Sequence, residues 1–517
     1  MMPELQSVRR ECTILTYRKC VFCAMILVKL NDDNFEYDIY SLVKAFYPKE
    51  DITFVDKIKP DEKNNLSYFL VINYIEKAIE LELYKPEDNE LLLIYEGDIE
   101  TDHSDRKETK NRLKRLIYYC FNKITDKTLP WGTLSGIRPT KIPLSMVEKG
   151  MSNEDIHDYM DKTYLASHEK ISLSIDIARH EHELIGDIND ESYSLYIGIP
   201  FCPTTCLYCS FSSYTYGMWL SRIDEYLEAL KKEIDFISNS LPLRKLKTIY
   251  IGGGTPTSLK CEELDRLLSI IGEAFPIEEL LEYTVEAGRP DSITRDKLKD
   301  ISKHGVSRIS INPQTMNDKT LKLIGRSHTT KDIISSYEMA REEGFDNINM
   351  DIIVGLPGED IDDLKNTLSQ IEKLSPDSLT VHSLAIKRSA RLNIYKEEYE
   401  DMLMYNSAKH MELAAASANK LGMEPYYLYR QKNMAGNLEN IGFARPKREG
   451  LYNVLIMEEK QSIIALGAGA ACKYVSNKGK SVTRSENVKD PGLYIDRIDE
   501  MIDRKSKKLE ELGWLTS

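Results

Sequence analysis

The segment YIGIPFCPTTCLYC, residues 196–209, decides how the rest of the sequence is interpreted. It begins as a short apolar run of the kind that forms a buried β-strand, and it continues into a loop that contains Pro and Thr. The loop carries Cys202, Cys206 and Cys209 in a CxxxCxxC spacing. The segment therefore predicts three thiol groups in one loop directly after a strand.

Three thiols in one loop are typical of an iron–sulfur site. Three thiolates would occupy three irons of a [4Fe-4S] cluster and leave the fourth iron open for an external chelate. The amino and carboxylate groups of S-adenosylmethionine (SAM) can supply that chelate, and a cluster of low potential can pass an electron into the sulfonium and break a C–S bond. We therefore predict that Cys202, Cys206 and Cys209 hold a [4Fe-4S] cluster that cleaves SAM to a 5'-deoxyadenosyl radical.

The alternatives to a cluster are a zinc site and a set of unrelated buried cysteines. A structural zinc ion usually has four protein ligands, and residues 210–229 contain neither a His nor another Cys to complete such a site. Cys20 and Cys23 form a CxxC pair that could bind metal or be redox-active, but no second pair follows nearby. We expect Cys261 and Cys472 to pack in a helix and in the core.

The cysteine segment opens a strand-then-helix pattern that starts at Tyr193. Short apolar runs alternate with amphipathic helical stretches, and short loops join them. Six such units in succession predict an α/β fold in which a parallel sheet curls into a partial (βα)6 TIM-type barrel. The chemistry of such a fold lies at the C-terminal ends of its strands. The expected strands are residues 195–199, 248–251, 282–286, 308–311, 347–354 and 378–384.

Glycines and polar side chains follow these strands. IGGGTP, residues 251–256, comes after the second strand, and its glycines would let a backbone approach the amino group of SAM closely. A structural turn would also account for the glycines, because the segment is neither a P-loop nor a GxGxxG fingerprint. Polar side chains lie at or after the ends of the later strands. Their carboxylate, amide and guanidinium groups are suitable partners for ribose hydroxyls, for adenine and for a ligand carboxylate. They are Glu286, Gln314, Asp351 and Arg326.

The rest of the chain divides around this core. Between Met25 and about Thr125, strand patterns alternate with helical patterns, and the turn-rich WGTLSGIRPTK, residues 131–141, then leads into charged helical stretches. The expected elements of the first region are a strand that begins at Met25, further strands at 52–55, 68–72 and 91–95, and helices at 40–46 and 112–121. The predicted segments are residues 1–24, a tail or extension; 25–128, a small α/β domain; 129–190, a helical connector; 191–400, the barrel; and 401–517, a C-terminal α/β extension that covers the substrate.

Composition limits the compartment and the partners. The formal net charge is -14, with 83 acidic against 69 basic residues, which works against binding to a phosphate backbone. Nine cysteines without regular spacing are not typical of a secreted disulfide scaffold, and no apolar run approaches the roughly 18 residues of a membrane-spanning helix. We therefore expect a cytoplasmic, soluble protein that spans no membrane and binds no nucleic acid.

These motifs resemble the radical SAM superfamily, and more closely the oxygen-independent coproporphyrinogen III oxidase family. The similarity runs from Tyr196 through the Gly-Leu-Pro segment that ends at Pro357 and on to Ala385. WGTLSGIRPTK and YLYRQKN, residues 427–433, resemble the branch called coproporphyrinogen dehydrogenase. The resemblance implies an enzyme that removes a β-hydrogen from propionate side chains of coproporphyrinogen III, releases carbon dioxide and leaves vinyl groups.

The resemblance also implies roles for single residues and for a partner. The residues that would contact the cluster-bound SAM or its neighbour are Tyr196, Gly253, Gly254, Thr255 and Glu286. The residues that would line a second SAM-type site are Gln314, Arg326, Asp351 and Ala385, with Tyr208 beside the cluster. An electron donor such as flavodoxin or ferredoxin would be the protein partner.

The chain departs from the family pattern at two positions. The family segment YxHIPFC has a histidine where this chain has Gly198. Better-characterised oxidases carry a further cysteine two positions after the third cluster ligand, where this chain has Phe211. Both departures leave the cluster motif intact. They bear on whether the chain binds a second SAM and on how it handles protons or electrons.

A sister group of the family binds and transfers haem and is marked by a His-Asn-x-x-Tyr-Trp segment. The comparable YNVLIM, residues 452–457, lacks the histidine and the tryptophan, which favours catalysis on coproporphyrinogen III over haem carriage. The tetrapyrrole propionates would need cations, since an unpaired buried charge is costly. The candidates are Lys387, Arg388, Arg391, Arg430 and Lys432. A haem carrier stays the alternative, and a radical enzyme that modifies tRNA is a weaker one because it would favour a basic surface.

Overall fold

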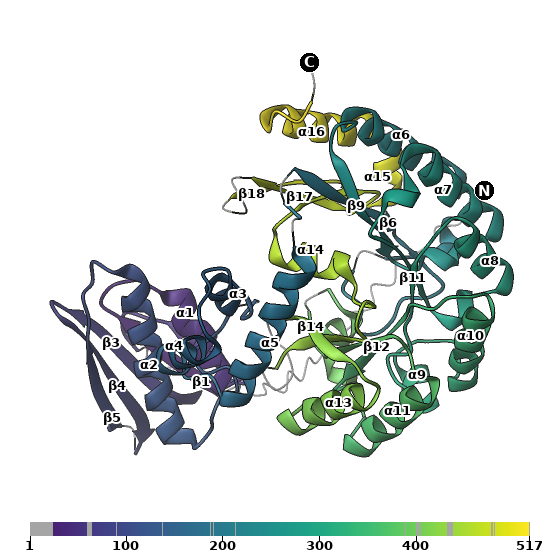
Figure 1. Cartoon of the computed structure of the whole chain (residues 1–517). Helices are drawn as coiled ribbons and strands as arrows, with labels where there is room; N and C mark the ends of the chain where they lie inside the picture. The colour runs from purple at the N-terminus through teal and green to yellow at the C-terminus, as the bar shows by residue number, and fades with distance from the viewer. Residues whose placement is uncertain are drawn as a thin grey trace, which may run out of the picture. The chain divides into compact units, whose positions relative to one another are not determined.

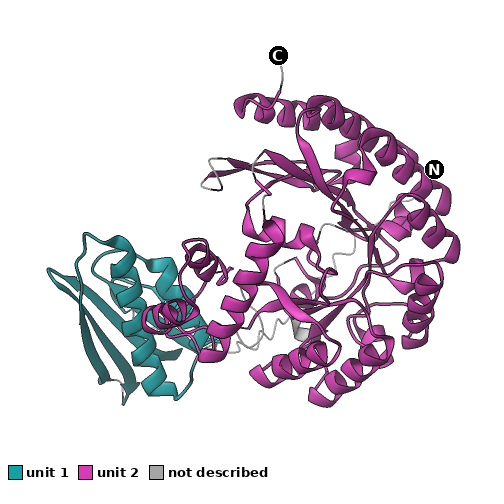
Figure 2. Cartoon of the chain, in the orientation of Figure 1, with its two compact units in different colours: residues 1–128 teal, residues 129–517 magenta. Residues whose placement is uncertain are grey.

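The computed structural model divides the chain into two compact units. They are Met1–Thr128 and Leu129–Ser517 (Figure 2). The described residues are 24–58, 65–88, 90–136, 138–186, 188–189, 191–211, 213–387, 389–399, 402, 404, 406–431, 438–476, 479 and 481–515. Cys20, Cys23, Arg388 and Lys432, which the sequence singles out, therefore lie outside the described residues.

The first unit is an α/β domain built on a five-stranded sheet of order β2-β1-β3-β4-β5. Strand β1 is parallel to both neighbours, whereas β3, β4 and β5 are antiparallel. Helix α2 buries Leu113, Ile117 and Phe121, and the Phe121 ring lies 5.8 Å from the Phe46 ring of α1. The expected strands and helices are confirmed, and β4 is additional. The elements are β1 (Met25–Leu30), α1 (Glu36–Phe46), β2 (Asp51–Phe54), β3 (Leu66–Ile75), β4 (Ala78–Glu87), β5 (Glu90–Glu100) and α2 (Arg106–Thr125).

Three helices open the second unit. They are α3 (Lys141–Val147), α4 (Asn153–Tyr164) and α5 (His168–Ile185). Ser152 and Ser167 precede α4 and α5, and each side chain accepts a hydrogen bond from a backbone N–H of the first turn, which satisfies a donor that has no partner within the helix. Ile156, Ile171 and Ile175 are buried together where these helices meet.

The centre of the second unit is a curved sheet whose strands follow each other in chain order (Figure 1). Strands β6, β9, β10, β11, β12 and β13 are parallel neighbours, so the predicted partial barrel and all of its expected strands are confirmed. Helices α6, α7, α8, α10 and α11 connect them on one side of the sheet (Figure 1). The strands are β6 (Ser192–Ile199), β9 (Lys245–Gly253), β10 (Glu282–Gly288), β11 (Arg308–Ile311), β12 (Ile348–Val354) and β13 (Ser378–Ser383). The helices are α6 (Ile223–Ser240), α7 (Cys261–Ala274), α8 (Arg295–Lys303), α9 (Asp318–Leu323), α10 (Thr330–Glu342), α11 (Ile361–Leu374) and α12 (Arg391–Ile394).

The C-terminal part of the chain extends the same sheet at both ends. Strands β15 and β14 add antiparallel beside β13, and β16 pairs parallel with β6 before β17 and β18 continue antiparallel. The division of the second unit into connector, barrel and covering extension stays a prediction, because all of these strands form one 11-stranded sheet in one compact unit. The elements are α13 (Ala408–Lys420), β14 (Glu424–Tyr429), β15 (Asn440–Ala444), α14 (Leu451–Glu458), β16 (Ser462–Leu466), β17 (Ala471–Ser476), β18 (Ser481–Glu486), α15 (Pro491–Asp496) and α16 (Ile498–Glu511).

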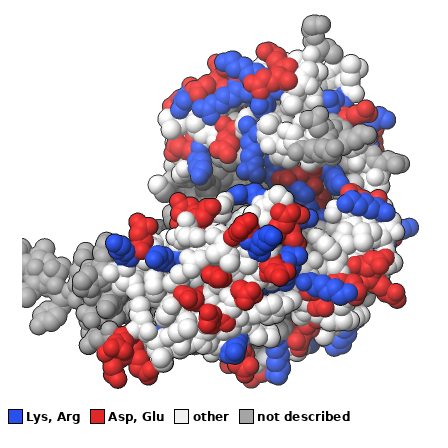
Figure 3. Space-filling view, turned by 90° about the vertical axis from the view of Figure 1, so that its left-hand side faces the viewer, with Lys and Arg blue, Asp and Glu red and all other residues white. Residues whose placement is uncertain are grey.

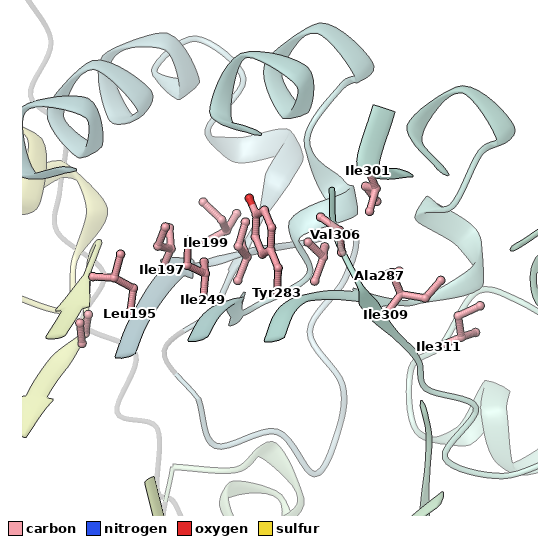
Figure 4. Close-up of a cluster of buried hydrophobic side chains, with 14 of the residues drawn as sticks. Leu195, Ile197, Ile199, Ile249, Tyr283, Ala287, Ile301, Val306, Ile309 and Ile311 are labelled. Atoms are coloured by element: carbon pink, nitrogen blue, oxygen red, sulfur yellow. The ribbon is translucent and has the colours of Figure 1, made fainter. Parts of the chain in front are cut away.

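A continuous apolar core lies between the parallel strands and the helices that cover them. Leu195, Ile197 and Ile199 alternate along β6 and are fully buried, and Ile249 and Tyr283 of the neighbouring strands lie beside them (Figure 4). Each fully buried side chain of this size contributes about 1.5–3 kcal/mol relative to an exposed one. Such packing fixes the strand ends and hence the residues that follow them. Among the described residues, no helix is long and apolar enough to cross a membrane.

Candidate iron–sulfur and SAM site

The cysteine loop leaves the sheet at the C-terminal end of β6. Its first cysteine lies in the two-residue strand β7 (Phe201–Cys202), which pairs with β8 (Tyr214–Thr215). Leu207 anchors the middle of the loop, because its N–H donates to Ile324 O and its carbonyl accepts from the Leu392 N–H, both at 2.9 Å. The Leu207 side chain is buried in a small apolar cluster with Ile324 and Leu392. These bonds hold the loop over the ends of the later strands.

The three thiols have different partners. Thr255 Oγ1 donates to Cys202 Sγ at 3.5 Å, and the Cys209 sulfur lies 3.9 Å from Ser213 Oγ. Burial raises the pKa of Cys202 to about 11, assisted by the nearby thiols, and burial also raises the pKa of Cys209. Both thiols are therefore protonated at neutral pH without metal, and metal binding must displace their protons.

The donor set of the loop fits a cluster better than a single metal ion. Among the described residues, no three His, Cys, Asp or Glu side chains are placed to hold one metal ion. In a [4Fe-4S] cluster the thiolates bind different irons, so they need not converge on one point. A structural zinc ion, in contrast, needs its ligands around one centre.

Two buried guanidinium groups lie near Cys206. Arg289 Nη1 donates to Cys206 Sγ at 3.7 Å, and Arg326 Nη2 donates to Tyr208 Oη at 3.2 Å. Burial opposes the charge of Arg326, yet Tyr208 and Cys206 hold its pKa above the ordinary value. Arg326 Nε is buried and has no hydrogen-bond partner. The site therefore presents positive charge and a free donor where an anionic group can bind.

The glycine turn after β9 packs directly on the cysteine loop. Gly254 N–H donates to Ile199 O at 2.8 Å, and a Cβ at Gly254 would lie 2.5 Å from Phe201 O. Gly253 has a φ of 102°, which favours glycine, and a Cβ there would lie 2.9 Å from Tyr196 Oη. The space that a side chain would need at these glycines is thus filled by protein atoms. Ligand contacts from this turn would come from its backbone polar groups.

Glu286 lies at the end of β10 against three stacked tyrosines. Tyr250 Oη donates to Glu286 Oε1 at 2.5 Å, and the Tyr250 ring is stacked 4.6 Å from the Tyr452 ring. The Tyr196 ring is stacked 6.3 Å from the Tyr250 ring and 6.4 Å from the Tyr452 ring. Burial raises the pKa of Glu286 to about 7. This carboxyl can therefore hold or release a proton near neutral pH.

The pKa of Asp351, on β12, is shifted in the opposite direction to that of Glu286. Burial opposes its charge, but His382 and hydrogen bonds lower the pKa of Asp351 overall. Asn349 Nδ2 donates to Asp351 Oδ1 at 2.7 Å, and His382 Nε2 lies 3.8 Å from Asp351 Oδ2. Two carboxyls of the same sheet edge thus differ in protonation, which is the arrangement that separates acid and base roles.

Gln314 and Ala385 complete the residues expected at this edge. Gln314 has a φ of 67°, and its backbone is held by two 2.9 Å hydrogen bonds, to Asp351 O and from Ile353 N–H. Its side-chain Oε1 is buried without a partner. Strained backbone and an unsatisfied acceptor are both features of binding sites. Ala385 follows β13 and is partly exposed.

The segment after β13 lies along the cysteine loop. Ser389 Oγ donates to Ser210 O at 3.3 Å, and Lys387 Nζ lies 5.8 Å from the centroid of the Phe211 ring. Arg391 begins helix α12. Lys387 therefore stands beside the cysteine loop, whereas the Arg391 guanidinium lies 5.9 Å from the centroid of the Tyr395 ring.

The structure places Arg430 elsewhere than the sequence suggested. Arg430 is 4% exposed, its Nη1 donates to Leu134 O at 2.7 Å, and its guanidinium lies 5.8 Å from the Trp131 ring centroid. Trp131 Nε1 in turn donates to Glu439 Oε2 at 2.7 Å. Arg430 and the WGTLSGIRPTK segment thus join the connector to the sheet, so Arg430 is not available to bind a propionate.

Sequence reasoning missed Arg289. It comes directly after β10, at the same edge as Glu286, and the rule that polar residues at strand ends carry chemistry could have found it. Its contact with Cys206 joins residues 83 positions apart and is visible only in the fold.

The chain is similar to several known proteins. Residues 196–371 match the model of the radical SAM superfamily. The chain is 42% identical over 418 residues to the oxygen-independent coproporphyrinogen-III oxidase-like protein HemZ of Bacillus subtilis (strain 168), covering 80% of this chain and 83% of that protein. It is 34% identical over 317 residues to the heme chaperone HemW of the same organism, covering 59% and 76%. A solved structure of coproporphyrinogen III oxidase (HemN) from Escherichia coli aligns with a TM-score of 0.48 and 24% identity, covering 62% and 72%.

Proposed function

Because the chain belongs to the oxygen-independent coproporphyrinogen-III oxidase-like family of radical SAM proteins, we propose that it is an enzyme that oxidatively decarboxylates coproporphyrinogen III. The family uses a [4Fe-4S] cluster and SAM. The proposed product is protoporphyrinogen IX, formed when propionate side chains each lose a hydrogen atom, carbon dioxide and one electron, which passes to a one-electron acceptor, and become vinyl groups.

Cys202, Cys206 and Cys209 hold the cluster in this proposal. When bound, the cluster would supply the electron for reductive cleavage of SAM and so for hydrogen-atom abstraction from the substrate. Glu286 offers a carboxylate to the amino group of SAM, and the buried thiols and tyrosines keep water from the site. Residues at the later strand ends would bind a second SAM-type ligand or the substrate. They are Gln314, Arg326, Asp351 and Ala385.

The observation that carries the substrate proposal is the basic segment hydrogen-bonded to the cysteine loop. Lys387 and Arg391 lie on this segment, and Ser389 ties it to Ser210. Acidic and basic side chains are interspersed on the face seen in Figure 3, and the chain carries a formal net charge of -14. Propionates therefore need local cations, and in this proposal the ammonium of Lys387, over the Phe211 ring, and the guanidinium of Arg391, at the start of α12, meet that need.

A haem carrier is the second candidate, and the identity to a heme chaperone favours it. Haem iron needs a side-chain ligand such as His, Cys, Met or Tyr. The comparable segment lies in helix α14, where Tyr452 is 4% exposed and stacked on Tyr250 and no histidine is present. A buried, stacked tyrosine is poorly placed to bind haem iron, and together with the missing histidine of the sister group this supports catalysis over carriage.

An anaerobic assay of the reconstituted protein distinguishes the two functions. We expect formation of protoporphyrinogen IX from coproporphyrinogen III with SAM and a reductant, and no stoichiometric binding of haem. Cys206→Ala serves as the control without cluster, and it should form no product. Stoichiometric haem binding without any conversion of coproporphyrinogen III would favour the carrier.

A further inference from the structure

The sulfur of Cys206 has a buried hydrogen-bond donor that the proposed function does not use. Arg289 is 3% exposed, and its Nη1 lies 3.7 Å from Cys206 Sγ. Contacts of this length to sulfur are within hydrogen-bond range, and a charged donor to a thiolate is stronger than a neutral one. Arg289 is thus placed to act on the middle cysteine of the loop.

Arg289 is held in this position from two sides. Asp291 binds it with both carboxylate oxygens, at 3.0 Å to Nε and 2.7 Å to Nη2. Its remaining Nη1 donates to Thr204 O at 3.0 Å and to Thr204 Oγ1 at 2.8 Å. The Thr204 hydroxyl in turn donates to Gly325 O at 2.8 Å. A planar guanidinium can satisfy this fixed set of acceptors, whereas a lysine ammonium cannot.

The charges around Cys206 do not balance without an anion. Arg289 and Arg326 are both buried, and Asp291 is the carboxylate paired with Arg289. Burying a charge without compensation costs several kcal/mol. A thiolate bound to a cluster would supply negative charge close to Arg289 and Arg326, which both interact with Cys206, so the surroundings suit the ligated form of Cys206.

We propose that Arg289 is a positioning residue that donates a hydrogen bond to the Cys206 thiolate and thereby raises the reduction potential of the cluster, with Asp291 holding Arg289 in place. This inference rests on Cys206 as a cluster ligand, which belongs to the proposed function. It concerns the electron that the cluster receives and is independent of the substrate.

The sign of the effect follows from electrostatics. One-electron reduction adds negative charge to the cluster, and a cationic donor at a ligating sulfur stabilises that charge. Hydrogen bonds to the sulfurs are among the factors that set the potential of such clusters. Loss of the donor should therefore make the cluster harder to reduce.

The test is a redox titration of the reconstituted protein followed by electron paramagnetic resonance. For Arg289→Met we expect about four irons per chain. We also expect the equilibrium constant for reduction of the cluster to fall about tenfold, which corresponds to a reduction potential about 59 mV more negative for one electron. Arg295→Met is the matched control, since it removes the same charge from an exposed arginine that pairs with Glu342 and Glu343. The control should keep the wild-type potential.

A second variant decides the matter if Arg289→Met does not load iron. Arg289→Lys keeps the positive charge but loses the planar fork that holds the donor at Cys206, and it should shift the potential in the same direction by a smaller amount. A wild-type potential in an iron-loaded variant of either kind would overturn the inference. Failure of the cluster assignment itself is distinguishable, because then the wild-type protein would take up no cluster and give no signal.

Discussion

Tyr250 donates a hydrogen bond of 2.5 Å to Glu286, and the two residues come from adjacent parallel strands, β9 and β10. The bond fixes a buried carboxyl at the sheet edge that also carries the cysteine loop. Because burial raises the pKa of Glu286 to about 7, its charge changes near physiological pH. The stability of the site and its affinity for a cationic ligand should therefore depend on pH.

The stability effect of Glu286 has a definite sign. A carboxyl whose folded-state pKa is raised destabilises the folded state as the pH rises from its ordinary 4.5 to about 7. Glu286→Gln has no such titrating group. When the pH rises from 5 to 8, the free energy of unfolding of the variant should therefore increase by about 1–3 kcal/mol relative to that of wild type. Thermal unfolding of the two metal-free proteins at pH 5 and at pH 8 measures this difference. The exposed Glu273→Gln should show no such gain, and an equal response of Glu286→Gln and wild type would contradict the pKa assignment.

The three cysteines of the loop should each be indispensable for the cluster. Cys202→Ala, Cys206→Ala and Cys209→Ala should each lose the iron content of about four per chain and the visible absorption of the cluster. Three irons of the cluster each need a protein thiolate, and each variant lacks one of them. Cys261→Ala is the matched control, since its thiol lies outside the loop and donates to Asp300 at 2.9 Å. A complete, SAM-responsive cluster in any of the three loop variants would refute the assignment.

Gly254→Val should affect iron as well as SAM. A side chain at Gly254 would displace Phe201, the residue before Cys202. Overpacking of this kind costs about 1–3 kcal/mol. We expect reduced iron content by metal analysis, whereas Gly272→Ala, with nothing within 4 Å of the added Cβ, should load iron normally.

Arg391→Ala should weaken binding of the porphyrinogen. Loss of a charged hydrogen bond costs about 1.5–3 kcal/mol, which corresponds to at least a tenfold higher KM. Cleavage of SAM without substrate should stay unchanged, because Arg391 does not contact the thiols. The exposed Lys420→Ala is the control for charge. An unchanged KM with full activity would mean that other cations bind the propionates.

The sequence by itself determined the barrel and the cysteine loop. Strands β6 to β13 are marked by local apolar runs and by helical periodicity, which act over a few residues and can be recognised without the fold. The same holds for Glu286 and Asp351, which lie at or near the ends of such strands. For this reason the partial barrel is confirmed strand by strand.

Only the tertiary structure decided what lies behind the loop and at the ends of the sheet. The contact of Arg289 with Cys206, the packing of Gly254 on Phe201 and the burial of Arg430 against Trp131 join residues far apart in the chain. The C-terminal strands divide between the two ends of one sheet in the same way. Such pairings depend on which surfaces meet when the strands assemble, and no local pattern of residues encodes that choice.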